Sequence, residues 1–138
     1  MLYYDPSGHK GDYPDGKSKP ENTKGNGKKY TTLYEASAGS GVTRGAHRNA
    51  ANREFYNKMK NDSSFKAKMD KKFGYDVMEH MNSGKGSLKN PSRDWVWHHP
   101  ADKKGVLELM PKSQHQNPAL QDILHPGPNG KGGFGLFY

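Results

Sequence analysis

The spacing of hydrophobic residues divides the chain into a polar first third, a helical middle and a strand-rich end. Between residues 43 and 81, apolar side chains recur at the spacing of one helix face. Two helices are each marked by three such residues: Ala51, Phe55 and Met59, then Phe65, Met69 and Phe73. The stretch YDVMEHM predicts a third, shorter helix.

The ends of these helices carry residues that commonly cap helices. Thr43 precedes the first helix, and Asp62 or Ser63 begins the second, each with a side-chain oxygen that can accept from free backbone N–H groups. Gly74 ends the second helix and Asp76 begins the third. Period and caps together predict a small helical layer whose lysines and arginines face outward.

Toward the C-terminus the period changes from helical to alternating. Residues 95–99 (WVWHH) predict a strand, PADKKG a turn, and residues 106–110 a second strand. Pro111 suits the first turn of a helix, and KSQHQ follows it. The sequence therefore predicts an α+β domain, in which the helical layer packs on a strand–turn–strand–helix unit.

The first 41 residues are rich in Gly, Pro, Asn, Lys and Ser and show no sustained apolar period. This composition is typical of a linker, so the sequence predicts a linker-like segment over residues 1–41 and a domain over residues 42–138. Within the linker, YTTLYEA (residues 30–36) is compatible with a short strand. The apolar residues of the glycine-rich tail are expected to dock on the domain: Phe134, Leu136, Phe137 and Tyr138.

Composition and charge limit what this domain can be. Only 30% of the 138 residues are hydrophobic, so the core must be small and depend on aromatic residues or on a bound metal. Because cysteine is absent, disulfides and thiolate zinc sites are excluded. The net charge of +8 favours a polyanionic partner, nucleic acid before membrane, although a merely basic surface is the simpler alternative. No apolar run approaches the ~20 residues of a membrane span, and the N-terminus does not resemble a signal peptide.

Histidines gather in the strand-rich part of the chain. His98 and His99 end the first predicted strand, His115 lies on the helix after the second strand, and His125 follows. A hairpin packed against a helix can direct several of these rings into one cleft. Neutral imidazole is a common metal ligand, and three protein ligands with one open position are usual in catalytic sites. Because neighbouring strand side chains point to opposite faces, His98 and His99 are expected to have different roles.

The segments WVWHH, LELMPKSQHQ and LHPGPNGKGGFGLF resemble nucleases of the HNH/endonuclease VII superfamily with a WHH-type signature, which occur as bacterial toxin domains. The resemblance covers about residues 95–137, and GVTRGAHRNAAN is a looser match upstream. It implies a ββα-metal motif at about residues 95–125 and metal-dependent hydrolysis of phosphodiesters. By the same resemblance His98, His115 and His125 would bind the metal, and His99 would be the general base.

The chain departs from the usual HNH pattern because no asparagine lies between His99 and His115. Asp102 or backbone carbonyls would then have to orient His99. Glu108 is a second candidate for orienting a histidine, and facing water is equally compatible with its position. Arg44, His47 and Arg48 are candidates for contacts with phosphate, with a solvated helix face as the alternative. The divalent ion is left open between zinc, magnesium, nickel and manganese.

The N-terminal stretch YYDPSGHK resembles the end of an Rhs or YD-repeat core, the shell-forming part of large polymorphic toxins. Such a core would be the N-terminal carrier, so a bacterial export system would deliver the toxin into the cytoplasm of a target cell. A dedicated immunity protein, acidic because of the +8 charge, would protect the producer. DNA is the favoured substrate. The alternatives are an RNase of the same fold, for example one acting on transfer RNA, a non-catalytic nucleic-acid-binding module held together by a metal, and a protein-interaction tail.

Overall fold

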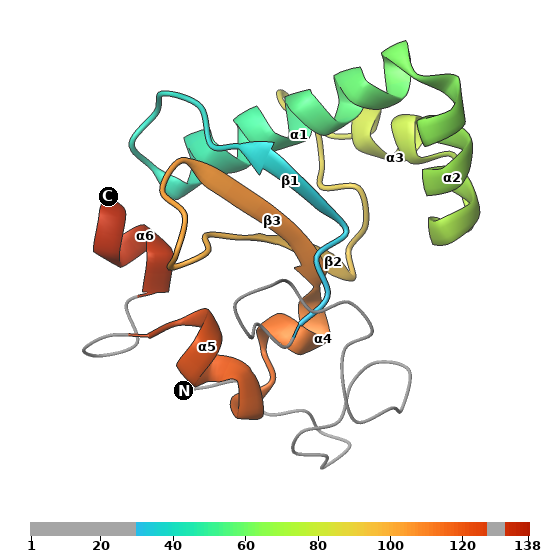
Figure 1. Cartoon of the computed structure of the whole chain (residues 1–138). Helices are drawn as coiled ribbons and strands as arrows, with labels where there is room; N and C mark the ends of the chain where they lie inside the picture. Colours follow the sequence, from blue (N-terminus) through green and yellow to red (C-terminus); the bar gives the residue numbers. More distant parts are fainter. Residues whose placement is uncertain (1–29, 127–131) are drawn as a thin grey trace.

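The structure is a computed structural model, and it describes residues 30–126 and 132–138 (Figure 1). The expectations for residues 1–29, including the Rhs-like motif, lie outside the described residues. So does the glycine-rich stretch 127–131.

The helical layer consists of α1 (Arg44–Asn61), α2 (Ser63–Phe73) and α3 (Val77–Asn82). The Thr43 side chain accepts a hydrogen bond from the backbone N–H of Ala46, and Asp76 caps α3 in the same way. At the start of α2 the cap is Asp62, which accepts from two backbone N–H groups, and not Ser63. Gly74 ends α2 in the left-handed conformation, with φ of 85°. The predictions for these three helices are confirmed.

A small antiparallel sheet contains three strands: β1 (Tyr34–Ser37), β2 (Trp95–His98) and β3 (Val106–Pro111). The strand order is β1-β3-β2, so β3 is central. The helical segments after it are α4 (Lys112–His115), the 3-10 turn η1 (Pro118–Leu120), α5 (Gln121–Leu124) and α6 (Gly132–Phe137). Both strands of the predicted hairpin are present, each within one residue of the expected end.

Residues 30–41, which the sequence assigned to a linker, are part of the folded body. Tyr34–Ser37 pair with β3, and Tyr30 is only 1% exposed. The side chain of Gln114 on α4 bonds both the backbone N–H and the hydroxyl of Thr31. A linker boundary at residue 41 is therefore too late. The β1 strand has only four residues, so its own pattern is weak, and its pairing with β3 supplies the stability.

The two faces of the sheet pack against different elements. On one face, Trp97, Leu107 and Leu109 join the main core with Phe55, Met59 and other residues of α1 to α3. On the other face, Met110 packs with Tyr30, Leu120 and Leu124. This arrangement, with helices and a separate antiparallel sheet, is of the α+β class.

The two tryptophans of β2 belong mainly to the core. Trp97 is 9% exposed, and its indole N–H donates to the side-chain oxygen of Asn52 at 2.7 Å. Trp95 is partly buried against the same core.

Within the described residues, no helix is both long and apolar enough to span a bilayer.

Candidate metal centre

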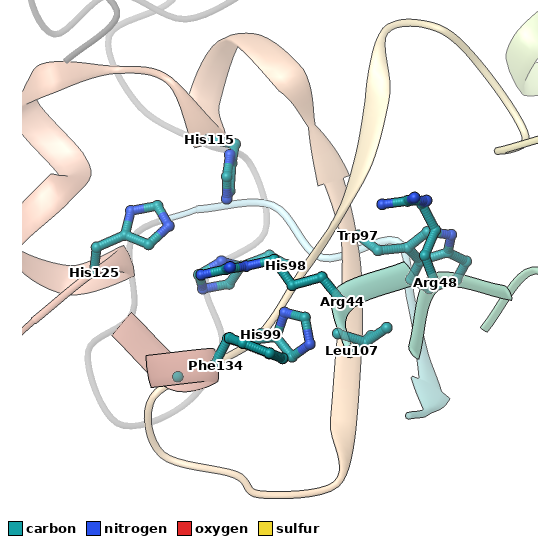
Figure 2. A pocket seen from close by; sticks show the side chains of 10 residues that line it. Arg44, Arg48, Trp97, His98, His99, Leu107, His115, His125 and Phe134 are labelled. Carbon is teal, nitrogen blue, oxygen red and sulfur yellow. The ribbon is translucent and has the colours of Figure 1, made fainter. Parts of the chain in front are cut away.

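Three of the predicted histidines come together on one side of the sheet. His98 is the last residue of β2, His115 the last of α4, and His125 directly follows α5. One ligand nitrogen from each ring lies within 4.8 Å of the others. The ring centroids are 4.8 to 5.4 Å apart, and Figure 2 shows His115 and His125 turned toward His98. The cluster joins residues from three separate elements.

Gln121 fixes the tautomer of His125. Its amide N–H groups donate to the carbonyls of His115 and Asn117 at 2.8 and 3.0 Å, so its oxygen must be the atom facing His125. That oxygen lies 2.7 Å from Nδ1 of His125 and therefore accepts the Nδ1–H proton. A neutral ring then keeps its lone pair on Nε2, which suits a metal ligand whose other nitrogen is held by a hydrogen bond.

The surroundings of these rings favour the neutral form. Burial lowers the pKa of His115 to about 4, and the nearby charges of His125 and His99 act in the same direction. Burial also lowers the pKa of His125, with a further contribution from the charge of Arg44. Neutral imidazoles offer lone pairs rather than protons, as metal binding requires.

The donor set fits a small divalent ion. Two nitrogens bound to one tetrahedral zinc at ~2.0–2.1 Å lie roughly 3.4 Å apart. The ligand nitrogens lie up to 4.8 Å apart, so small side-chain rotations that move each nitrogen by about an ångström would bring them to this spacing. In the part of the chain that the structure describes, the group contains three histidines and no fourth side chain.

His99 belongs to a different set of contacts, on the α1 side of the sheet. Its Nε2 lies 2.9 Å from Nδ1 of His47, while Nε2 of His47 lies 2.8 Å from the Gly41 carbonyl. Because a carbonyl only accepts, His47 must carry its proton on Nε2, and its Nδ1 accepts from His99 when it is neutral. His99 then donates through Nε2, and its Nδ1 carries a free lone pair.

The environment of His99 also keeps it neutral. Burial, followed by the charges of His47 and Arg44, lowers its pKa to about 4. The ring is partly exposed, and it lines a cavity of about 170 Å³ together with the three clustered histidines. His99 thus lines the same cavity as the potential metal ligands, with one unprotonated ring nitrogen.

Glu108 is buried and does not face water. It lies directly opposite His98 in the β2–β3 register, so the two side chains share one face of the sheet. The hydroxyl of Tyr30 donates to its carboxylate, and the Tyr30 ring meets His98 edge-on at 5.8 Å. Burial and this carboxylate raise the pKa of Tyr30. Tyr30 and Glu108 are thus hydrogen-bonded to each other and are buried next to His98.

The three candidate phosphate contacts on α1 are not equivalent. Arg44 and Arg48 are exposed and line the cavity, and the Arg44 guanidinium lies 4.1 Å above the centre of the Phe134 ring. His47 is fully buried, and both of its ring nitrogens are already engaged. The two arginines are therefore the candidates for binding an anion, whereas His47 forms a hydrogen bond with His99.

The C-terminal segment covers the His47–His99 pair. The ring of Tyr138 lies 4.5 Å from that of His47, and Phe134 lies 5.1 Å from His99. This close approach depends on Gly133, because a Cβ there would lie 2.4 Å from the His99 carbonyl oxygen. The ring contacts of Phe134 and Tyr138 agree in part with the expectation for the tail, because Tyr138 is still 41% exposed and Leu136 is 47% exposed.

Sequence reasoning missed Gln121, Tyr30 and the partnership of His47 with His99. Gln121 is four residues before His125 on a short helix, a spacing that brings side chains together and was a usable signal. Asp102 lies exposed on the turn between β2 and β3, while His47 makes the contact to the His99 ring. No protein-family model, curated protein or solved structure matches this chain. The function is therefore inferred from the chemistry of the site.

Proposed function

We propose that this chain is a metal-dependent endonuclease that hydrolyses phosphodiester bonds, with DNA as its favoured substrate. One observation carries the proposal: a group of three potential metal ligands and a fourth, unprotonated histidine line the same cavity. Arg44 and Arg48 line it as well and add positive charge for an anionic substrate.

Each side chain has a role that its contacts support. His98, His115 and His125 would hold a divalent ion, which when bound would neutralise charge developing on the leaving oxygen. His99 accepts a proton from the attacking water at Nδ1, a step worth about 10²–10⁴-fold in rate. Its pKa of about 4 keeps it unprotonated at neutral pH.

His47 and the two arginines complete the site. His47 accepts the Nε2–H of His99 and so holds the orientation of a ring that lines the cavity. Arg44 and Arg48 are exposed and would contact the non-bridging oxygens of the scissile phosphate. Those contacts would position any phosphodiester, which is why DNA and RNA are not separated by them.

The chain order supports an HNH-like ββα motif. β2 and β3 are antiparallel neighbours, α4 follows directly, and the histidines come from the end of β2 and from α4. This order agrees with the resemblance to WHH-type toxin nucleases. With it come an Rhs-type carrier, delivery into the cytoplasm of a target cell and an acidic immunity protein, which we propose on that resemblance.

A non-catalytic module held together by a metal is the less favoured alternative. Such a site would need a fourth protein ligand to close it. In residues 30–126 and 132–138 the ligand group has three members, and His99 is bonded to His47 instead. An open coordination position is therefore the arrangement that the contacts favour.

The decisive experiment incubates the purified full chain with plasmid DNA and with total RNA, before and after chelation. We expect DNA cleavage that stops with chelator and returns when zinc, magnesium, nickel or manganese is added back. The His99→Ala variant is the control for contaminating nuclease. Cleavage of RNA alone would transfer the proposal to an RNase, and cleavage unaffected by chelator would overturn it.

A further inference from the structure

We propose that a basic groove beside the histidine cavity binds the phosphates that flank the scissile bond. We define the basic groove by its four cationic residues, Arg48, Lys89, Arg93 and Lys112. It has a volume of about 670 Å³ and runs between the connection after α3, the start of β2 and the start of α4. The inference rests on the proposed function and adds a binding site for a longer stretch of nucleic acid.

The charge of the basic groove is not neutralised by its own walls. None of its lining residues carries a carboxylate, and all four cations are exposed. Across the described ranges, none of the four joins an ion pair, whereas Lys58, Lys66 and Lys103 each contact a carboxylate. Cations held close together without counter-charges favour a polyanion, whose phosphates replace the condensed counterions.

Hydrogen bonds, one of them buried and two partly buried, hold one wall of the basic groove in place. The amide nitrogen of Asn52 donates to the side-chain oxygen of Asn90 at 3.0 Å, while its own oxygen accepts from Trp97. The amide nitrogen of Asn90 therefore remains available as a donor in the groove. Next to it, the hydroxyl of Tyr75 donates to the Pro91 carbonyl at 2.6 Å. The wall between Lys89 and Arg93 is thus fixed to the core before any ligand binds.

Arg48 joins the basic groove to the histidine cavity. Its side chain lines both hollows, and Arg44, one helical turn earlier on α1, lines the cavity alone (Figure 2). On the far side, the backbone N–H of Lys112 donates to the Asp94 carbonyl, which holds the start of α4 beside β2. A polymer cut in the cavity must place its neighbouring phosphates on an adjacent surface, and the basic groove shares Arg48 with the cavity. This shared residue favours a nucleic acid over an acidic protein.

The test removes Arg93 and Lys112 together and leaves Arg48, which also lines the cavity, unchanged. The matched control is Lys68→Ala/Lys71→Ala on α2, where two exposed lysines are removed for the same change in charge. Binding of a short DNA duplex is measured across a salt series in the His99→Ala background. Hydrolysis of a small diester, bis(p-nitrophenyl) phosphate, is measured in chains that keep His99.

We expect the Arg93→Ala/Lys112→Ala variant to bind DNA at least about tenfold more weakly, with a salt slope reduced by about 2, and to hydrolyse the small diester at the original rate. The control variant should retain most of its DNA binding. The inference would be overturned if the two double variants bound DNA equally well. It would also be overturned if the Arg93→Ala/Lys112→Ala variant lost DNA binding and hydrolysis of the small diester to the same degree. Poly-glutamate binding that matches DNA binding and falls with it would overturn it in favour of an acidic protein. Failure of the unsubstituted chain to hydrolyse either substrate would instead count against the proposed function.

Discussion

His98 and His99 are neighbours in the sequence but face two different environments. His98 points to the face of the sheet that carries α4 and α5, where it is 2% exposed and meets two further histidines. His99 is partly exposed on the α1 side and contacts His47 and the C-terminal helix. Alternation along a strand thus gives two identical side chains different partners within one residue.

One hairpin end could in this way supply both of the proposed roles, a metal ligand and a base. The clustered histidines and His99 line the same cavity but have separate hydrogen-bond partners. Gln121 forms a hydrogen bond with His125, and His47 forms one with His99. Substitutions on one side should therefore leave the other side intact.

The largest expected effect separates the two members of the doublet. His98→Ala should abolish both metal binding and activity and lower the melting temperature, because bound metal contributes to folding free energy. His99→Ala should reduce activity by about 10²–10⁴-fold while metal content and melting temperature stay near those of the unsubstituted chain. Metal analysis, thermal melts and plasmid cleavage on the two variants check this.

His115→Ala is the matched control, since it removes a second histidine from the His98 side. It should behave like His98→Ala in all three measurements. If all three variants lose metal and stability to the same degree, the division between ligand and base is wrong.

A smaller effect is expected from the residue behind His99. His47→Ala removes the acceptor that orients the ring, and groups in such positions are worth about 10–100-fold. Activity should fall by that factor, with metal content unchanged. Lys68→Ala, which removes an exposed lysine of α2 away from the cavity and the basic groove, is the control and should retain full activity. Loss of metal in His47→Ala would show that the two sides are coupled.

The corresponding substitution on the other side is Gln121→Ala. Without the amide, His125 loses the partner that fixes its tautomer, so metal affinity should fall by about 10–100-fold. At saturating metal the activity should recover, which His47→Ala cannot do. Titration of zinc into the two variants, followed by cleavage assays at low and high metal, distinguishes them. Unchanged affinity in Gln121→Ala would mean that His125 does not bind the ion.

The smallest effect concerns pH and the metal-free chain. Burial lowers the pKa of His115 from 6.5 to about 4 in the folded state, so the unfolded state binds protons more readily between these values. The free energy of unfolding should therefore decrease as pH falls from 6.5 toward 4 and should be unaffected by this group above 6.5. Thermal melts in chelator across this range measure it, and His115→Gln should give a flatter curve. An equally steep curve in that variant would contradict the assignment.

Local signals in the sequence were sufficient for the helices and the hairpin. In α1 and α2 the apolar period agrees with the caps at Thr43 and Asp62, so pattern and chemistry indicate the same boundaries. The meeting of His98 with His115 followed from the hairpin and the helix after it, all within one short stretch. Each of these features depends on residues close together in the chain.

Contacts between distant segments were not predictable in the same way. The four residues of β1 acquire their role only from β3, and residues 30–41 have the composition of a linker. The hydrogen bond between His47 and His99 joins α1 to the end of β2, and no pattern in either segment predicts contact with the other. From the sequence, His47 was a candidate phosphate contact or part of a solvated helix face, and its contact with His99 was not predicted.

The position of β1 has a consequence for how the chain folds. Ser37 pairs with Val106 and Tyr34 with Leu109, so the central strand is enclosed only when segments far apart in the sequence meet. Closing such a long loop is slow compared with forming α1 to α3, whose contacts are local. A chain that emerges from the ribosome N-terminus first therefore carries β1 as an unpaired edge until β3 arrives. Because Glu108 lies on β3 and His98 pairs with it, we expect the proposed metal centre to be among the last parts of the molecule to form.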